Sequence, residues 1–295
     1  HSQVDRSVMR EWLDMHPEVI VTDSLFRFDP ESAYCATALD YDYACRVHLC
    51  AAAARAIELA GIGRGMRVLD AACGTGAATI PAAARVGAGG RVVAVDFSPE
   101  MLALATEKAS RRSLLNIDWR LEDMTTLDLP DEHFDAVLCV LGIFNVPDMA
   151  RQVKLFWRAL RPGGCLVLVS FGAELLAPLY DLVLGAARAT QRELGALQPW
   201  LRAHTPDQLR AVLGAAGIHD ASITVETTTS PLPNPADRWR IVRGAGLSQP
   251  IERLPPDEVA HIRDATNRAI LDRDVDSLTT SFLFTLARKV TAVER

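Results

Sequence analysis

Hydrophobic and polar positions along the chain follow two alternating patterns between residues 66 and 171. Short runs of apolar and β-branched residues are separated by stretches in which apolar residues recur every three or four positions. The first pattern is typical of buried strands and the second of amphipathic helices. Together they predict βαβ units and a mostly parallel sheet. The strand-like runs are MRVLDA (66–71), RVVAVDF (91–97), NIDWRLE (116–122), FDAVLCVL (134–141) and CLVLVSF (165–171).

Several of the intervening helical stretches carry start or stop signals. Ser98 is suited to an N-cap, and Pro99 then occupies the first helical position. After the last of the five runs, the pattern predicts one helix over 174–194. A further helix is expected to start near Thr205 and to end at Gly217.

The remaining segments predict the domain organisation of the chain. ASITVETTT at 221–229 and SFLFTLARKV at 281–290 read as two more strands. The interval between them is too long for a hairpin turn and partly helical in pattern, so we predict a cap insertion at about 231–278. Residues 1–60 are expected to form a helical lid, and residues 61–295 the main α/β domain. The predicted fold is therefore α/β, with a doubly wound, mostly parallel seven-stranded sheet.

The net charge and the hydrophobic content of the chain limit the kinds of partner that the protein is expected to bind. The 295 residues are 49% hydrophobic and carry a formal net charge of -6, whereas a nucleic-acid-binding protein usually presents a basic surface. The most apolar stretch, residues 165–187, contains Glu174, Pro178 and Asp181 and reads as a strand followed by a helix. We therefore expect no nucleic-acid partner and no membrane span.

The six cysteines and the polar N-terminal stretch bear on the compartment. No CxxC pair occurs, so we expect no metal site. Apolar surroundings of Cys139 and Cys165 suggest reduced, buried thiols, and the first residues show no signal-peptide pattern. These features predict a cytoplasmic protein, and a homodimer is compatible with them.

The stretch VLDAACGTG at 68–76 is the first sign of a ligand site. Glycines at the turn between a strand and a helix let a nucleotide-like ligand approach the backbone. Gly74 and Gly76 match the start of the dinucleotide fingerprint, but Thr79 stands at its third glycine. Asp70 would repel a pyrophosphate at the mouth of this loop. Asp96, at the end of the second strand, is suited to accept hydrogen bonds from ribose hydroxyls.

The third strand ends in a second acidic group. Asp123 can accept the exocyclic amine of an adenine, and Met124 can pack on its ring. The three acidic residues Asp70, Asp96 and Asp123 suit a ligand in which adenosine carries an amino acid and a positive charge instead of phosphates. S-adenosylmethionine has this chemistry.

Five segments in this order resemble the class I methyltransferases that use S-adenosylmethionine. They are VLDAACGTG, VDFSPEML, LEDM, FDAVLCVLGIFNVPD and LRPGG, and the resemblance covers roughly residues 66–171 and extends to the terminal strand pair. The branch it resembles is that of the ubiquinone/menaquinone C-methyltransferases, many of whose members act on small molecules. One departure is Ala72, where the family often has glycine.

The resemblance implies a role for each matching residue. Asp70 would hold the loop near the methionyl amine. Asp96 would bind the ribose diol, with Phe97 beside the adenine, and Asp123 and Met124 would recognise the adenine. The cofactor-binding residues implied are Asp70, Ala71, Gly74, Gly76, Asp96, Phe97, Met101, Asp123, Met124, Val140 and Leu141.

Methyl transfer from a sulfonium needs a general base only if the acceptor loses a proton, because the leaving group is neutral. Candidates for a base are His204, His48 and Tyr41, each of which could equally be a packing or surface residue. Positioning of the acceptor without any base is the alternative. Candidate contacts to the acceptor are Tyr34, Tyr43, Asn145 and Trp239.

Two sequence patterns of macromolecule-modifying enzymes are missing, and this favours a small-molecule acceptor. There is neither an NPPY-like tetrapeptide nor a Pro-Cys nucleophile. The expected function is S-adenosylmethionine-dependent methylation of carbon, oxygen or nitrogen, as in natural-product biosynthesis. Two alternatives stay open: a protein of this fold that binds the cofactor without methyl transfer, such as a cyclase, and a nicotinamide oxidoreductase.

Overall fold

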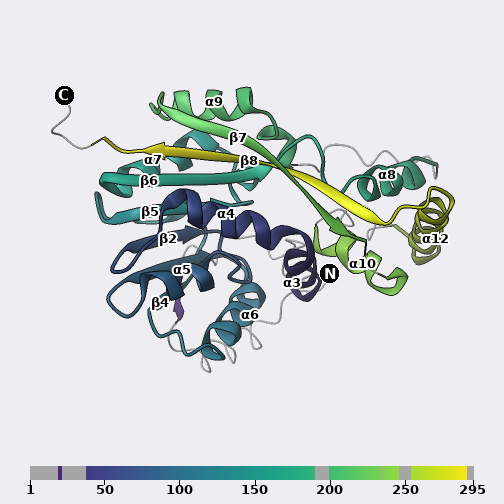
Figure 1. The fold of residues 1–295 in the computed structure, drawn as a ribbon, viewed down its shortest axis with the longest axis horizontal. Coiled ribbons are helices and arrows are strands. Elements are labelled where there is room, and N and C mark those ends of the chain that lie inside the picture. Colours follow the sequence, from purple (N-terminus) through teal and green to yellow (C-terminus); the bar gives the residue numbers. More distant parts are fainter. Residues whose placement is uncertain (1–18, 22–37, 190–198, 233, 246–253, 291–295) are drawn as a thin grey trace.

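The computed structural model describes residues 19–21, 38–189, 199–232, 234–245 and 254–290. These form one eight-stranded sheet with the strand order β1-β4-β3-β2-β5-β6-β8-β7 (Figure 1). Strand β8 runs antiparallel to β6 and β7, and the other pairs are parallel. The strands are β1 (Val19–Val21), β2 (Arg67–Ala71), β3 (Arg91–Asp96), β4 (Ile117–Leu121), β5 (Phe134–Val140), β6 (Leu160–Phe171), β7 (Ala221–Pro231) and β8 (Ser277–Arg288).

The predicted fold class is confirmed, and seven of these strands are the predicted ones. The short strand β1 pairs with β4 at the edge and adds an eighth. Chain order reverses between β2 and β5, because β3 and β4 extend the sheet on one side and β5 and β6 on the other. In doubly wound sheets, ligands bind beyond the carboxyl ends of the strands at this reversal.

Helices cover both faces of the sheet. In Figure 1, α4 and α5 lie in front of the strands and α7 lies behind them. The helical elements are α3 (Ala38–Ala44), the π-turn η2 (Cys45–Leu49), α4 (Cys50–Ala60), α5 (Thr79–Val86), α6 (Pro99–Ser110), the 3₁₀ turns η3 (Met124–Thr126) and η4 (Ile143–Asn145), α7 (Met149–Ala159), α8 (Leu179–Ala189), the 3₁₀ turn η5 (Pro199–Arg202), α9 (Pro206–Ala215), α10 (Pro235–Gly244) and α12 (Pro256–Asp272).

The helix signals act as the sequence predicts. The Ser98 hydroxyl accepts the Met101 N–H and caps α6, with Pro99 at its first position. Thr205 and Gln208 form a reciprocal capping box at the start of α9. Gly61 ends α4 in the left-handed conformation, with a φ of 63°.

The predicted helix over 174–194 is wrong at its start. Ala177 pairs with Thr279 of β8 through two backbone hydrogen bonds of 2.8 and 2.9 Å. Residues before Leu179 therefore extend the sheet's hydrogen bonding, and α8 begins only there. Periodicity alone could not show this, because the apolar residues of 175–179 suit either arrangement.

Helices from the predicted lid and cap segments gather at one end of the molecule. Helices α10 and α12 lie between β7 and β8 in the chain, where the insertion is predicted. Helix α10 packs on α3, and α12 packs on α8 (Figure 1). A Cβ on Gly244 would lie 2.2 Å from the Asp40 carbonyl oxygen, so the close approach of α10 to α3 requires glycine there. Helix α4 belongs to the sheet layers instead, since it packs on β5, β6 and β8.

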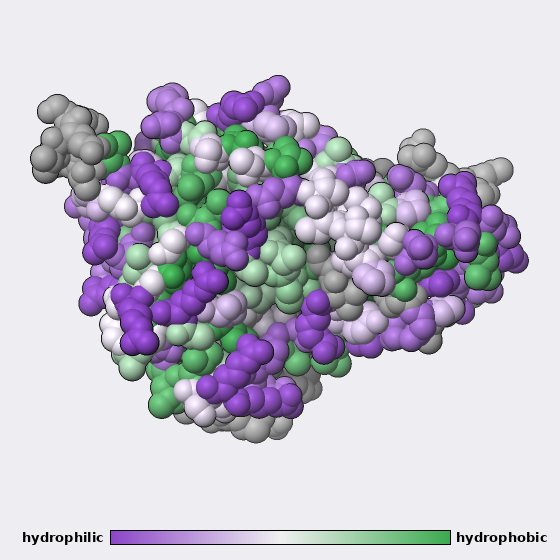
Figure 2. Space-filling view, viewed as in Figure 1, coloured by the Kyte–Doolittle hydropathy of each residue, from purple (hydrophilic) through white to green (hydrophobic). Residues whose placement is uncertain are grey.

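Apolar residues on the surface are interspersed with hydrophilic ones. Figure 2 shows both kinds alternating over the visible face. The large exposed hydrophobic residues come from separate elements, as Leu115, Leu201 and Leu271 do. Across the described ranges, none of the helices combines the length and hydrophobicity that a membrane crossing requires.

Candidate functional site

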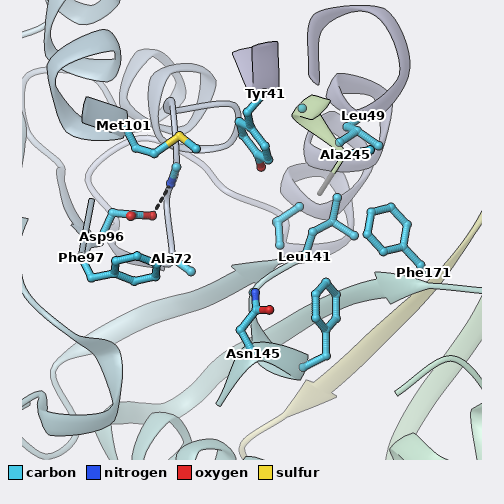
Figure 3. Close-up of a pocket in the computed structure, with 15 residues that line it drawn as sticks. Tyr41, Leu49, Ala72, Asp96, Phe97, Met101, Leu141, Asn145, Phe171 and Ala245 are labelled. Atoms are coloured by element: carbon cyan, nitrogen blue, oxygen red, sulfur yellow. Dashed lines mark hydrogen bonds between the residues drawn. The ribbon is translucent and has the colours of Figure 1, made fainter. Parts of the chain in front are cut away.

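The carboxyl ends of the parallel strands border an open cavity, which we call the first cavity. Its empty space is about 610 Å³, and this volume, like those of the two cavities beside it, includes space open to solvent. Figure 3 shows Asp96, Phe97 and Met101 gathered at one end. Leu141 and Phe171, with Leu49 and Ala245 from the lid and cap, lie toward the other end. The full lining is Tyr41, Leu49, Ala72, Gly74, Asp96, Phe97, Met101, Val140, Leu141, Gly142, Phe144, Asn145, Phe171, Gly244 and Ala245.

A second cavity of about 880 Å³ adjoins the first at the same sheet edge. Ala72, Asp96, Phe97 and Asn145 line both cavities, so the two form one continuous strip. The rest of the second lining is Val95, Glu122, Asp123, Met124, Thr125, Val146 and Pro147.

Asp96 ties the glycine loop to the start of α6. Its Oδ2 accepts the Gly74 N–H at 2.7 Å, and its Oδ1 accepts the Ser98 N–H at 3.0 Å (Figure 3 shows the first bond). The side chain is 7% exposed, and burial raises the pKa of its carboxyl to about 6 despite these bonds. The Phe97 N–H also interacts with this carboxylate, and the lone-pair capacity that remains can accept a ligand hydroxyl at the junction of the two cavities.

Asp70 occupies a different position from the one expected. It is 1% exposed, and its Oδ2 accepts the Thr79 hydroxyl at 2.5 Å. Burial raises the pKa of Asp70 to about 7. The residue lines only a small third cavity of about 310 Å³, beside Tyr41 and Cys45. Asp70 thus holds the loop through Thr79, and it does not line the ligand strip.

Backbone strain clusters where the strip crosses the strand ends. Ala72 and Leu141 both have a φ of 59°, in the left-handed region that residues with a Cβ rarely adopt. A Cβ on Gly142 would lie 2.6 Å from the Ala72 Cβ. The unusual Ala72 is therefore accommodated because glycine stands at 142.

The lid helix α3 is fastened over the glycine loop. A Cβ on Gly74 would lie 3.4 Å from the Tyr41 ring, so Tyr41 sits directly above the loop. Asp42 accepts the Thr75 hydroxyl at 2.8 Å and the Lys108 ammonium at 2.5 Å. These bonds join α3 to the loop after β2 and to α6.

The charge of the strip fits S-adenosylmethionine better than a dinucleotide. Three carboxylates, Asp96, Glu122 and Asp123, line the two cavities. Within the described part of the chain, no lysine or arginine lines either one. A pyrophosphate would meet carboxylates without compensating cations, whereas a sulfonium and an amine would not.

Most predicted cofactor residues are brought together by the fold, although their roles stay predictions. Gly74, Asp96, Phe97, Met101, Asp123, Met124, Val140 and Leu141 line the strip, as does the predicted acceptor residue Asn145. Ala71 is fully buried at the end of β2, and Gly76 packs on Ile80; neither lines a cavity described here.

The predicted catalytic and acceptor residues are mostly not brought together. Among these, Tyr41 lines the first cavity. His204 points its Nδ1 at the Leu201 carbonyl oxygen, 2.6 Å away, and lines none of the three cavities. Tyr43 lies under the Arg240 guanidinium, 4.2 Å from its ring centre.

Three further predicted residues either line none of the cavities or are not described by the structure. Trp239 packs against the core rather than lining a cavity. His48 lies in η2, but its side chain is outside the description, and Tyr34 lies outside the described residues. His204, Tyr43 and Trp239 thus line none of the three cavities, and their roles stay predictions.

Sequence reasoning missed several lining residues. Phe144 and Phe171 follow β5 and end β6, so their place at the carboxyl edge was within reach of the strand pattern. Leu49, Gly244 and Ala245 come from the lid and cap. Nothing in the sequence indicates where those helices pack.

Comparison with known proteins agrees with this geometry. A family model for a methyltransferase domain matches residues 68–164, from β2 into β6. A protein of Serratia proteamaculans is 33% identical over 180 residues, which are 56% of this chain and 71% of that protein. The chain belongs to the S-adenosylmethionine-dependent methyltransferases.

Within that family, the similar relatives share one name. The Serratia protein is a ubiquinone/menaquinone biosynthesis C-methyltransferase. Proteins of that name from Proteus mirabilis and Pectobacterium atrosepticum are 36% and 34% identical over 42% of this chain. The match spans about half of each of those two proteins, 49% and 51%.

Solved structures share the fold at low identity. A phosphoethanolamine N-methyltransferase 2 from Haemonchus contortus, bound to S-adenosylhomocysteine, has a TM-score of 0.54 at 18% identity over 96% of this chain and 60% of that one. The YcgJ protein from Bacillus subtilis has a TM-score of 0.53 at 18% identity over 81% and 98%. The [4+2]-cyclase SpnF has 0.52 at 21% identity over 82% of both chains.

Proposed function

We propose that this protein methylates an apolar small molecule, which binds at the lid-facing end of the first cavity. One observation carries the proposal: the continuous strip is acidic at one end and apolar at the other. Leu49, Leu141, Phe144, Phe171 and Ala245 line the apolar end. A charged or phosphorylated acceptor would be desolvated there without a partner.

The acidic end of the strip is the proposed cofactor site. Asp96 accepts the ribose hydroxyls, and Asp123 accepts the adenine amine, with Met124 and Phe97 packed beside the ring. Asp123 is already oriented for this, because its Oδ1 accepts the Thr125 N–H at 2.8 Å. The fit is supported by Gly74, which lines the first cavity and has a φ of 53°, a conformation that suits glycine.

Catalysis follows from positioning. S-adenosylmethionine would supply a sulfonium methyl group, which the acceptor attacks in line while S-adenosylhomocysteine leaves. Phe144, Phe171 and Leu141 would hold the acceptor against that methyl and exclude water. Tyr41 and Asn145 line the same cavity and can hydrogen-bond an acceptor oxygen. The relatives are named C-methyltransferases, and we favour a carbon acceptor, such as the ring carbon of a phenolate, whose displaced proton passes to water after the methyl group is transferred.

Formation of S-adenosylhomocysteine tests this proposal. The enzyme would be incubated with S-adenosylmethionine and a panel of apolar hydroquinones and phenols, with phosphoethanolamine as the charged comparison. We expect turnover only with members of the apolar set. Turnover of phosphoethanolamine alone would contradict an apolar acceptor site.

A matched pair of variants tests where the acceptor binds. Ala245→Phe fills the apolar end and should abolish turnover while leaving the affinity for S-adenosylhomocysteine within about twofold. Ala54→Phe makes the same change on the exposed side of α4 and should keep both. Equal loss of cofactor affinity in Ala245→Phe would move the acceptor elsewhere.

A cyclase or binding role without methyl transfer is the second candidate. Its support is the shared fold with the [4+2]-cyclase SpnF. Binding of S-adenosylmethionine that persists without any S-adenosylhomocysteine forming, together with a rearranged organic substrate, would favour it. Among the described residues, no lysine or arginine lines the strip, which speaks against a nicotinamide oxidoreductase. Titration with NAD would test this alternative.

The proposal also includes the compartment and partners. The described cysteines are free thiols, which supports a reducing, cytoplasmic location. The net charge of -6 supports the absence of a nucleic-acid partner. The lid over 1–60, the cap and a homodimer stay predictions.

A further inference from the structure

The turn between the lid helix and α4 brings two thiols together. In η2, the Cys50 N–H donates to the Cys45 carbonyl oxygen, five residues back. In an α-helix, residues five apart are about 140° apart around the axis. A π-turn is wider, and its hydrogen bond between residues five apart brings such residues nearer to one face. The Sγ atoms of Cys45 and Cys50 are 3.7 Å apart as a result.

The two thiols differ in acidity. The hydrogen bond from Cys45 lowers the pKa of Cys50 to about 7. Lys108 and Arg46 act in the same direction, while burial and the Asp42 carboxylate oppose it. Cys45 is 3% exposed, and the hydrogen bond with Cys50 together with burial raises its pKa well above the usual value. Cys50 is half-buried and so has a path to solvent.

The other described cysteines lack this combination. Cys73, Cys139 and Cys165 are buried, and burial raises the pKa of each thiol. Cys73 and Cys165 direct their sulfur at backbone carbonyl oxygens, 3.8 and 3.3 Å away. These three thiols therefore stay protonated and shielded near neutral pH.

The thiol pair borders the proposed catalytic strip. Cys45 lines the third cavity with Tyr41 and Leu49. Tyr41, on the helix before the turn, and Leu49, within it, both also line the first cavity. A covalent change across the turn therefore acts on two residues that shape the first cavity.

We propose that Cys45 and Cys50 are a redox-reactive thiol pair, which peroxide oxidises to a disulfide that changes the lid-facing end of the first cavity. The thiol pair lies apart from the cofactor strip, so its reactivity does not depend on the proposed class of acceptor.

The reaction balances with hydrogen peroxide as the two-electron oxidant. The Cys50 thiolate attacks one oxygen, the O–O bond breaks, and hydroxide leaves and takes up a proton to become water. The Cys45 sulfur then attacks the sulfenic sulfur of Cys50. The S–S bond forms, the S–O bond breaks, and the Cys45 proton leaves with the oxygen in a second water.

Peptide mapping tests the chemistry without any methyl acceptor. Trypsin cleaves after Arg46, so a disulfide would join residues 28–46 to residues 47–55. A Cys35→Ser background removes the other cysteine of the first peptide. With equimolar hydrogen peroxide, we expect the linked peptides, two hydrogens lighter than the separate pair and separated again by dithiothreitol.

Control variants test whether Cys45 and Cys50 are the two thiols that react. Cys50→Ser should give no link, and Cys139→Ser should react like the parent. Lys108→Met should slow the reaction about threefold or more, because the thiolate fraction of Cys50 falls. Accumulation of Cys50 sulfinate without the link, or faster oxidation of Cys73, Cys139 or Cys165 in the folded protein, would overturn the proposal.

Hydrogen exchange tests the effect on the lid. The oxidised protein should show changed amide exchange in residues 38–60 and 141–145, relative to the reduced protein. The Cys50→Ser variant, treated with the same peroxide, should show no such change. A disulfide that forms without altering exchange in either segment would refute the link to the first cavity.

Discussion

Replacing Asp96 by alanine probes the centre of the proposed cofactor site. Asp96 accepts backbone N–H groups from Gly74 and Ser98, at 2.7 and 3.0 Å, and faces the junction of the two cavities. The change therefore removes an internal anchor of the glycine loop and the proposed acceptor for the ribose hydroxyls. The two effects can be measured separately.

The structure gives a magnitude for each effect. A buried hydrogen bond to a charged group contributes about 1.5–3 kcal/mol. Burial raises the pKa of Asp96, so its charged form is itself costly and part of the two-bond contribution is offset. We expect Asp96→Ala to lower the free energy of unfolding by about 2 kcal/mol. Loss of the ribose bonds should weaken cofactor binding by about 2 kcal/mol, or roughly 30-fold.

Calorimetric titration with S-adenosylhomocysteine measures binding, and urea unfolding of the ligand-free protein measures stability. Asp123→Ala is the matched control at the neighbouring strand end, and it should weaken binding less, because one amine contact is involved. If Asp96→Ala is folded and binds S-adenosylhomocysteine within twofold of the wild type, the ribose assignment is wrong.

Three further predictions follow from the site and its surroundings. His204→Ala should keep turnover within about twofold at every pH, because its ring faces the Leu201 carbonyl; loss of a pH limb near neutrality would restore it as a base. Arg240→Ala breaks the 3.0 Å ion pair that joins α10 to Asp40 of α3, the helix that carries Tyr41, so acceptor turnover should fall several-fold with S-adenosylhomocysteine affinity nearly intact; calorimetry beside turnover checks this. Burial raises the pKa of Asp70 to about 7, so the folded protein holds a proton that the unfolded chain releases above about pH 4. The unfolding free energy of the wild type relative to Asp70→Asn should therefore decrease as pH rises from about 4 to 7, and a flat difference would contradict this.

The parallel sheet was predictable because its strands are buried on both faces. Runs such as RVVAVD and FDAVLCV are nearly continuously apolar, and the helices between them carry their own caps. The carboxyl ends of such strands must meet at one edge, which is why Asp96, Asp123 and Asn145 could be placed near one another.

The direction of side chains at that edge was harder to predict. Asp70 and Asp96 both end strands beside the glycine loop, yet Asp70 turns inward to Thr79 while Asp96 faces the cavity. Sequence spacing does not distinguish the two, because the difference lies in which neighbour supplies the hydrogen-bond donor.

Contacts between the lid, the cap and the sheet were not predictable at all. Tyr41 reaches the site because α3 packs on α10 and because Asp42 bonds Thr75, which is 33 residues further along the chain. Tyr43, two residues on, points instead at Arg240. Helical periodicity shows that such residues lie on different faces, but it does not show which partner each face will meet.

A crystal structure of the protein with S-adenosylhomocysteine tests the central claim most directly. The account predicts the ribose within hydrogen-bond distance of Asp96, the adenine beside Asp123 and Met124, and the sulfur directed toward the apolar end near Leu141 and Phe171. A ligand bound in the reverse orientation, or outside the strip between the two cavities, would contradict it.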